Sequence, residues 1–238
     1  MKSAPKKNST NGKNVAVPKA VVQRLSFYLR ELQHLVRDGR DTISSTQLGQ
    51  LLGFTDAQVR KDLAYFGHFG YPGIGYRCEE LIAAICRILG TNQQWPVALV
   101  GAGNLGRALL GYRGFMQQGF RLVAAFDIDP AKQCSAIEGV PVYSFDRLAQ
   151  IVQEHSIKLA IVAVPAAAAQ GVADRLVEAG VEGILNFAPV TLSLPEGVSS
   201  VGVDLAIELE QLSFAVTNRS ANHLRREPSG TDSEAEKG

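Results

Sequence analysis

The segment from Val97 to Leu110 constrains the fold of this chain more than any other part of its sequence. Four apolar residues, 97–100, lead directly into Gly101-Ala102-Gly103-Asn104-Leu105-Gly106, and helical spacing follows. A second apolar run, 122–126, ends in Asp127, which lies 21 residues after Gly106. A glycine-rich turn between a strand and a helix, with an acidic residue about 20 positions later, is typical of a dinucleotide-binding βαβ unit. We therefore expect a parallel sheet with a dinucleotide site.

The chemistry of this turn indicates which dinucleotide to expect. The glycines permit a tight turn and close approach of a pyrophosphate to the backbone, and Asp127 can accept hydrogen bonds from ribose hydroxyls. Ile128 follows Asp127, with no Arg or Lys beside it to neutralise a 2′-phosphate. We therefore expect NADH or NAD⁺ rather than the phosphorylated cofactors.

Strand and helix patterns alternate through the rest of this region, which predicts a Rossmann-like domain over residues 95–203. Strands are expected at 141–143, 159–164, 184–185 and 198–203, and helices at 145–154 and 167–179. Ligands of such sheets lie beyond the carboxyl ends of the strands. The expected nicotinamide end is therefore lined by the mostly apolar set Val164, Pro165, Asn186 and Phe187.

Residues 18–90 have helical spacing instead, and within them Tyr28–Gly67 reads as a helix-turn-helix region. A first helix begins at Pro18 and ends near Gly39, with Val21, Val22 and Leu25 in its core-facing stripe. A short helix capped at Ser44 and ended by Gly53 precedes a second one that starts at Thr55 or Asp56.

The second short helix has the composition of a DNA-reading helix. Gln58, Lys61 and Tyr65 share its outward face, and Arg60 lies at the rim of that face. A merely solvated helix face is the alternative. Residues 67–76 then hold four glycines interleaved with aromatic residues, which favours a β-hairpin wing bearing His68 and Tyr71, although a flexible loop has the same composition.

Charge supports this division of the chain. The formal net charge is only +1, but residues 1–90 carry 13 Lys and Arg against 7 Asp and Glu, whereas residues 91–238 carry 11 against 16. The basic part includes residues 1–17, expected to be a disordered basic arm, and points to nucleic acid. There is no apolar run long enough for a membrane span and no signal peptide, so cytoplasmic localisation is expected. Three cysteines (Cys78, Cys86, Cys134) without C-x-x-C spacing predict neither a disulfide framework nor a metal site.

The C-terminal region favours a binding protein that acts as a dimer. Residues 204–221 form an expected helix with Leu205, Leu209, Leu212 and Val216 in one stripe and Ile207 and Phe214 on the opposite side. We expect its own sheet to cover one side and a partner subunit the other, giving a homodimer suited to a palindromic operator. The remaining residues, 222–238, are expected to be a disordered tail.

No catalytic residues are expected. The four histidines lie away from the expected nicotinamide end, and no substrate domain follows the sheet. Two alternatives stay open: an NAD-dependent oxidoreductase, and a coenzyme A- or nucleotide-binding module, each with an accessory helical domain.

Taken in order, these motifs resemble the family of the redox-sensing transcriptional repressor Rex. The resemblance runs from about Pro18 to Asn218 and is carried by residues 58–63, 66–76, 101–106, 126–130 and 184–189. It implies a homodimer of winged-helix and Rossmann domains that exchanges its C-terminal helix. It also implies DNA binding when NADH is low and release when NADH rises.

The resemblance also implies roles for single residues. Arg60 and Lys61 match DNA-contacting positions, and Ser44 and Ser45 belong to the same expected surface. The trio Arg30, Tyr112 and Asp204 matches a set that exchanges partners between states, with Tyr112 counted also at the cofactor site. Many relatives carry Lys or Arg at the wing tip, where this chain has Tyr71 and Pro72; His68, Tyr71 and Arg77 are the candidates to replace that cation.

Overall fold

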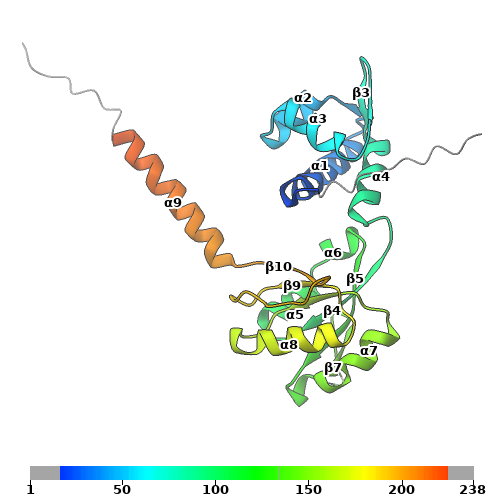
Figure 1. The fold of residues 1–238 in the computed structure, drawn as a ribbon, viewed down its shortest axis with the longest axis vertical. Helices are drawn as coiled ribbons and strands as arrows, with labels where there is room; N and C mark the ends of the chain where they lie inside the picture. The colour runs from blue at the N-terminus through cyan, green and yellow to red at the C-terminus, as the bar shows by residue number, and fades with distance from the viewer. Residues whose placement is uncertain (1–16, 134, 225–238) are drawn as a thin grey trace, which may run out of the picture. The chain divides into compact units, whose positions relative to one another are not determined.

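The chain divides into two compact units between Gln94 and Trp95, at the end of a polar stretch, 90–94, that separates the helical residues 18–90 from the expected Rossmann-like domain (Figure 1). The computed structural model describes residues 17–133 and 135–224, with side chains through residue 218. The expected basic arm apart from residue 17, Cys134, and the tail from residue 225 lie outside the described residues.

The first unit is a winged helix, as predicted. A short antiparallel sheet of order β1-β3-β2 stands beside the helices, and β2 and β3 form the predicted hairpin. The two-residue strand β1 was not predicted, since so short a segment has no periodicity. The elements are α1 (Lys19–Arg37), β1 (Thr42–Ile43), α2 (Ser45–Leu52), α3 (Asp56–Ala64), β2 (Gly70–Tyr71), β3 (Gly75–Arg77) and α4 (Cys78–Leu89).

Local sequence signals define the helix-turn-helix. Ser44 caps α2 in a reciprocal capping box with Gln47, Gly53 ends α2 in the left-handed conformation, and the Thr55 side chain caps α3. Thr55, rather than Asp56, is thus the cap. Val22, expected in the core stripe of α1, is 40% exposed, because Val21 at the neighbouring position already faces the core.

A buried carboxylate joins α3 to α1. Asp62 of α3 is fully buried and accepts hydrogen bonds from Arg24 Nε (2.5 Å) and Nη2 (2.8 Å), from the Tyr28 hydroxyl (2.8 Å) and from Gln58 Nε2 (2.7 Å). Burial alone would raise the pKa of Asp62, but these donors outweigh it and hold the pKa below its usual value. Burial and the bond to Asp62 raise the pKa of Tyr28. The orientation of α3 on α1 therefore depends on an ionised group inside the unit.

The second unit contains a doubly wound sheet of order β10-β9-β8-β4-β5-β7-β6, parallel except for β6. From β4 the chain adds β5 and β7 on one side and then crosses to add β8, β9 and β10 on the other. The direction of winding therefore reverses between β4 and β8, where such sheets bind ligands. The strands are β4 (Trp95–Val100), β5 (Phe120–Asp127), β6 (Ala136–Ile137), β7 (Val140–Ser144), β8 (Leu159–Val162), β9 (Gly183–Asn186) and β10 (Ser199–Gly202).

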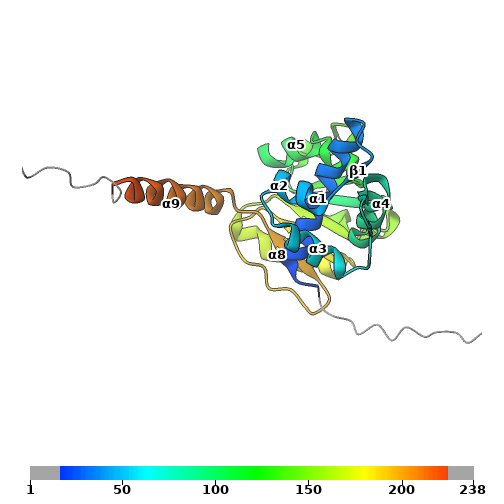
Figure 2. The ribbon, with the colours of Figure 1, turned by 90° about the horizontal axis from the view of Figure 1, so that it is seen from above.

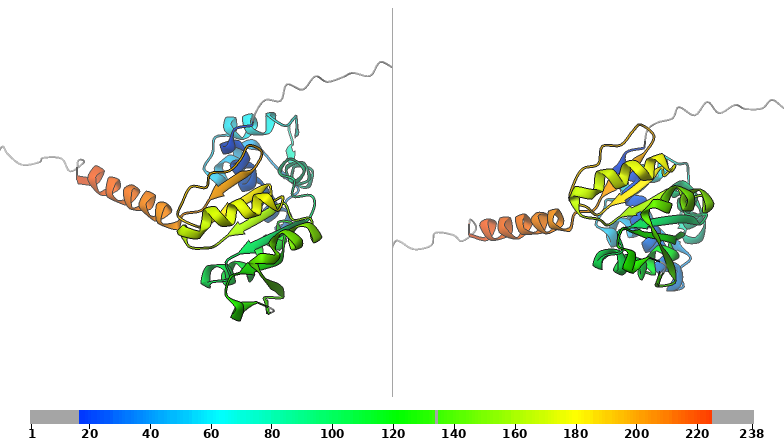
Figure 3. Two further views of the ribbon diagram at one scale, coloured as in Figure 1. Left: turned by 60° about the horizontal axis from the view of Figure 1, so that its bottom comes forward. Right: turned by 90° about the horizontal axis from the view of Figure 1, so that it is seen from below.

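Helices cover the two faces of this sheet unequally. Helices α7 and α8 pack on one face, with α8 lying along it in Figure 3, whereas α5 and α6 pack on part of the other. Beyond α5 and α6, the second face is open over β8 to β10 and holds an apolar cavity of about 350 Å³. The helical segments are α5 (Asn104–Leu110), α6 (Gly114–Gln117), η1 (Pro130–Lys132), η2 (Phe145–Arg147), α7 (Leu148–Glu154), α8 (Ala166–Glu178) and α9 (Leu205–Leu224).

Several boundaries differ from the sequence expectations. The helix expected at 145–154 begins as the 3₁₀ turn η2, which Ser144 caps, and β8 ends at Val162 instead of residue 164. The short elements α6, η1 and β6 were not predicted.

The last helix, α9, is one continuous helix that ends three residues beyond the expected 221 (Figure 2). Every side chain described in it, 205–218, is exposed, and Leu209 and Phe214 are 67% and 71% exposed. The expectation that its own sheet covers one apolar side is therefore wrong: within a single chain both sides face solvent. None of the helices in the described ranges is long and apolar enough to cross a membrane.

We predict that Arg24→Met destabilises the winged helix by about 3 kcal/mol, because it leaves the Asp62 carboxylate buried without its cation. Asp62→Asn should lower the stability of the winged helix by only about 1 kcal/mol, because Arg24 is partly exposed and water can solvate its charge after the carboxylate is gone. Hydrogen exchange of α1 and α3 in the intact protein measures both, with Arg37→Met, an exposed arginine of the same helix, as the control.

The same pair makes the unit sensitive to acid. Because the folded pKa of Asp62 lies below its unfolded value of about 3.9, its contribution is present above that pH and disappears as the pH falls through the folded pKa. Arg24→Met removes the main cation and moves this loss to higher pH. Equal exchange in Arg24→Met and Arg37→Met from pH 4 to 7 would contradict the assignment.

Candidate functional sites

Two glycines of the turn after β4 are required by close contacts within the protein. Gly101 has φ +98°, and a Cβ there would lie 2.4 Å from the Ala163 carbonyl oxygen at the end of β8. A Cβ on Gly106 would lie 1.9 Å from the carbonyl oxygen of Gly101. Because Gly101 has no side chain, the turn can pack against the end of β8, and because Gly106 has none, α5 can pack against the turn. Both contacts lie where the winding of the sheet reverses.

Gly103, between them, has a different explanation. Its φ of −76° suits any residue, and no atom lies within 4 Å of a Cβ built on it. The space in front of the turn is therefore open at the position where a pyrophosphate would approach the backbone. Asn104 and Leu105, which complete the motif, are exposed at the start of α5. The turn fits a dinucleotide on these contacts.

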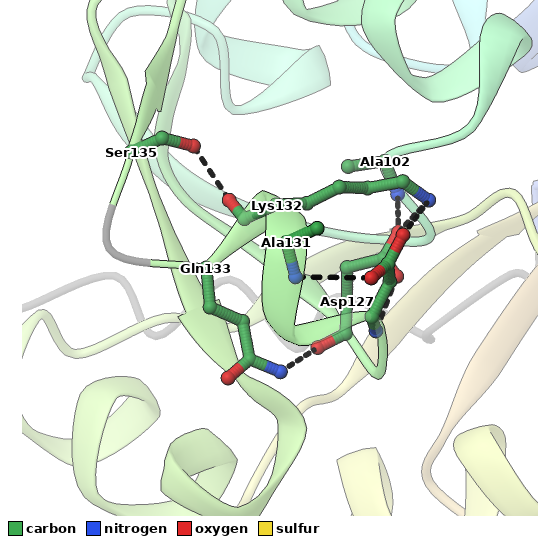
Figure 4. A network of polar contacts seen from close by, with 7 residues as sticks. Ala102, Asp127, Ala131, Lys132, Gln133 and Ser135 are labelled. Carbon is green, nitrogen blue, oxygen red and sulfur yellow. Dashed lines mark hydrogen bonds and ion pairs between the residues drawn. The ribbon is translucent and has the colours of Figure 1, made fainter.

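Asp127 lies at the carboxyl end of β5 beside this turn, as the spacing predicts (Figure 4). Its Oδ2 accepts a hydrogen bond from the Ala102 amide (2.8 Å), and its Oδ1 accepts one from the Asp129 amide (2.9 Å). The side chain is only 8% exposed. Burial would raise the pKa of Asp127, but the Asp129 amide, the Lys132 ammonium and the Ala102 amide together hold it below the usual value. An ionised carboxylate at this place suits the ribose hydroxyls of a dinucleotide.

Lys132 is the residue of this site that the sequence analysis missed. Its Nζ lies 3.1 Å from Asp127 Oδ2 and 3.7 Å from Asp129 Oδ2. The expectation of no cation beside Asp127 is wrong: the next residue in the sequence is Ile128, which is 84% exposed, but the 3₁₀ turn η1 brings Lys132 back to the carboxylate (Figure 4). The available signal was Pro130 after Asp129, a sequence that favours a turn at this position.

The expected nicotinamide end lies at the carboxyl ends of β8 and β9. Val164 and Phe187 are half-buried and Pro165 is exposed at the start of α8. Asn186 is buried, donates to the carbonyl oxygens of Ala188 and Val190, and accepts from the Ala188 amide. Its side chain therefore holds the loop that carries Phe187.

The candidate DNA surface of α3 differs in detail from the helical projection. Lys61 and Tyr65 are exposed as expected, whereas Gln58 is half-buried and its amide is held by Asp62. Arg60 Nη1 donates to Asp56 Oδ2 (2.7 Å) and to Ser45 Oγ (3.1 Å), so it links α3 to the start of α2. Lys61 has no ion pair among the described residues, and its ammonium is therefore available to a phosphate.

The wing carries its cation on β3. The Arg77 guanidinium lies 5.2 Å from the centre of the Tyr71 ring and bonds to Glu80, which also accepts from the Tyr71 hydroxyl (2.9 Å). This hydrogen bond raises the pKa of Tyr71. His68 is exposed before β2. Arg77 is thus a cation beside the wing rather than at its tip, and it is ion-paired with Glu80.

The three residues of the implied switch have local partners in this structure. Arg30 lies over the Phe27 ring (5.6 Å), and Tyr112, 59% exposed, packs edge-on against Phe115. Asp204 caps α9 by accepting from the Ala206 amide (2.9 Å).

In the part of the chain that the structure describes, the cysteines and acidic residues add no further site. Cys78, which is buried, and Cys86 have free thiols. Within residues 17–133 and 135–224, no three His, Cys, Asp or Glu side chains are grouped to hold a metal ion.

Family comparisons match each unit separately. Residues 16–64 match the family described as "Putative DNA-binding protein N-terminus", and residues 92–190 match the family "CoA binding domain". The two matches fall on the winged helix and on the Rossmann-like sheet.

Relatives match both units together. The redox-sensing transcriptional repressor Rex of Carboxydothermus hydrogenoformans is 49% identical over 86% of this chain and 98% of its own. A crystal structure of the protein RSP in complex with NAD⁺ and operator DNA has a TM-score of 0.82 at 34% identity and covers 90% of this chain and 99% of RSP. RSP in complex with NADH has a TM-score of 0.81 at the same identity, over 89% of this chain and 99% of RSP. The chain therefore belongs to the Rex family of redox-sensing transcriptional repressors.

Proposed function

We propose that this protein is a homodimeric transcriptional repressor that binds operator DNA when NADH is low and leaves it when NADH binds. The observation that carries the proposal is the presence, in one chain, of a winged helix with exposed Lys61 and Tyr65 and of a dinucleotide turn closed by Asp127. The solved complexes of RSP with NAD⁺ and operator DNA and with NADH support the same pairing of ligands. Such a regulator acts where the DNA is, in the cytoplasm.

A sensing role is favoured over catalysis by the residues at the nicotinamide end. A dehydrogenase needs an acid or base near the transferred hydride. The loops after β8 and β9 present Pro165, Phe187 and Pro189, and the polar Asn186 is engaged within its own loop. His155 lies at the end of α7, before β8, at the opposite end of that strand.

The same lining explains how the protein distinguishes the two redox states. The nicotinamide ring is positive in NAD⁺ and neutral in NADH, whereas the contacts of Asp127 and of the glycine turn are common to both. Burying the positive ring against Val164, Pro165 and Phe187 costs more free energy than burying the neutral one. Only this difference in affinity can shift the protein between its DNA-binding and released states.

The proposed dimer follows from two exposed apolar surfaces. The large apolar side chains described in α9 are 50–71% exposed, and the sheet face over β8 to β10 holds an apolar cavity whose lining includes the half-buried Leu159 and Leu185 and the exposed Val201. Apolar surface of this extent on a monomer marks an interface. We propose that α9 is exchanged with a second copy, which covers its apolar sides and presents two winged helices to a palindromic operator.

The direct test titrates a complex of the protein and a labelled palindromic operator with NADH and, separately, with NAD⁺ at one fixed salt concentration. NADH is expected to release the operator at concentrations at least tenfold lower than NAD⁺, as followed by fluorescence anisotropy. Turnover of a 2-hydroxy acid or an aldehyde with NAD⁺ would instead support an oxidoreductase, and displacement of NADH by coenzyme A would support a coenzyme A-binding module.

Two single substitutions should separate DNA binding from cofactor sensing. Lys61→Ala should weaken operator binding about tenfold and lower its salt dependence by about one phosphate contact, with NADH affinity unchanged.

Asp127→Ala should keep operator affinity and weaken NADH binding about 100-fold, because charge-assisted hydrogen bonds to the ribose are lost. Asp129→Asn, in the same loop, is the control. An Asp127→Ala protein that NADH still releases at the wild-type concentration would refute the cofactor site.

Leu212→Glu is expected to dissociate the dimer, because a carboxylate would replace an apolar side chain at the proposed interface of α9. Gln211→Glu adds the same charge at the adjacent exposed position and should leave the dimer intact. Sedimentation equilibrium gives the mass of each variant. A folded monomer in the wild type, or a Leu212→Glu dimer of unchanged affinity, would refute the exchanged helix.

A further inference from the structure

We propose that Lys132 is a second specificity residue of the dinucleotide site, one that the Asp127 carboxylate holds in an ion pair and that would otherwise bind a 2′-phosphate. The inference rests on the proposed function, because it concerns the adenosine end of the same site. It gives a role to the positive charge of Lys132, which selectivity for NADH does not itself require.

The geometry brings both charges to the edge of the sheet where the adenosine ribose is expected. Asp127 ends β5 and bonds to the Ala102 amide of the glycine turn, so its carboxylate is directly beside the path of the dinucleotide. Lys132 Nζ lies 3.1 Å from the same Oδ2 atom and its side chain is 33% exposed. The ammonium is therefore next to the carboxylate and still accessible to a ligand.

The backbone around Lys132 fixes this placement (Figure 4). Asp129 caps η1 through the Ala131 amide (3.0 Å), Gln133 Nε2 donates to the Asp127 carbonyl oxygen (2.9 Å), and Ser135 Oγ donates to the Lys132 carbonyl oxygen (2.5 Å). None of these three bonds uses the Asp127 carboxylate, although the Asp129 amide also donates to its Oδ1 (2.9 Å). The three named bonds therefore remain when that carboxylate is removed, and they keep Lys132 near the site.

Charge then decides which cofactor is accepted. A ribose 2′-hydroxyl donates a hydrogen bond to the Asp127 carboxylate, whereas a 2′-phosphate is repelled by it. Lys132 offsets part of that repulsion, although Asp127 at 3.1 Å and Asp129 at 3.7 Å already engage its ammonium. Without Asp127 the remaining competitor is the more distant Asp129, and the ammonium can pair with a phosphate. Selectivity for NADH thus depends on the carboxylate suppressing a cation already in place.

The test is a double-mutant cycle of Asp127→Ser and Lys132→Ala in the full chain, with NADH and NADPH affinities measured by calorimetry. Asp127→Ser should weaken NADH about tenfold and strengthen NADPH about tenfold, the loss and gain expected for single charge-assisted bonds. Adding Lys132→Ala should abolish the gain for NADPH. Lys132→Ala alone should weaken the residual NADPH binding of the wild type less than threefold, because Asp127 and Asp129 already engage its ammonium.

Lys158→Ala is the matched control, because it removes a partly exposed lysine paired with Glu182 just before β8, at the opposite end of that strand from the cofactor loops. If Lys132→Ala leaves the ratio of NADPH to NADH affinity unchanged in both backgrounds, Lys132 is not a specificity residue. Should Asp127→Ser melt at a lower temperature than the wild type, Asp127→Asn replaces it, since an amide oxygen can still accept from Ala102. A wild type that binds neither cofactor contradicts the proposed function itself; NADH binding without an effect of Lys132 contradicts only this inference.

Discussion

The hydrogen bond from the Ala102 amide to the Asp127 carboxylate ties together the two chain segments that the cofactor unit must hold in register. Ala102 belongs to the turn after β4, Asp127 ends β5, and the Gly101 amide adds a second bond to the Phe126 carbonyl oxygen. On its other side the turn lies against Ala163 so closely that only glycine fits at position 101. The turn is thus clamped between the ends of β5 and β8. The Asp127 carboxylate stays ionised despite its burial, because three hydrogen-bond donors hold its pKa below the usual value.

The winged helix uses the same physical device for a different purpose. Asp62 is a buried carboxylate on α3, and its donors come from α1 and from α3 itself. A buried charge is costly unless it is fully paired, so only a narrow range of orientations of α3 on α1 satisfies Asp62. The exposed Lys61 and Tyr65 are then presented from a helix of defined orientation. In each unit, therefore, an inward-facing aspartate positions the groups that face a ligand.

Sequence patterns predicted the parts of this structure that depend on periodicity and on local turn chemistry. The strand before Gly101, the spacing to Asp127, and the caps at Ser44 and Gly53 are all local signals, and the structure places each as expected. The position of Lys132 was not predictable in the same way, because η1 reverses the chain and brings a side chain five residues away back to Asp127. The role of Asp62 was missed because a charged residue on a helix is normally assigned to the surface. The exposure of α9 was missed because its pattern shows how many sides are apolar, but not which chain covers them.

The energetics of the proposed switch point to the ends of β8 and β9. Moving a dimer from 1:99 to 99:1 needs about 5.5 kcal/mol of differential binding, so two cofactor sites acting on one dimer supply about half each, or roughly 100-fold in affinity per site. In the proposed site, Asp127 and the glycine turn contribute none of this difference, because both redox states would share their contacts. We therefore propose that the difference arises near Val164 and Phe187. The Asn186 carbonyl oxygen, directly before Phe187, accepts a hydrogen bond from the Val203 amide (2.8 Å), and Asp204 then caps α9. Phe187 is therefore connected to the start of α9 by a short path: it follows Asn186, whose carbonyl oxygen is bonded to Val203, the residue before the α9 cap. A nicotinamide ring that displaced Phe187 would act at the beginning of this path, which leads to the helix that the proposed dimer exchanges.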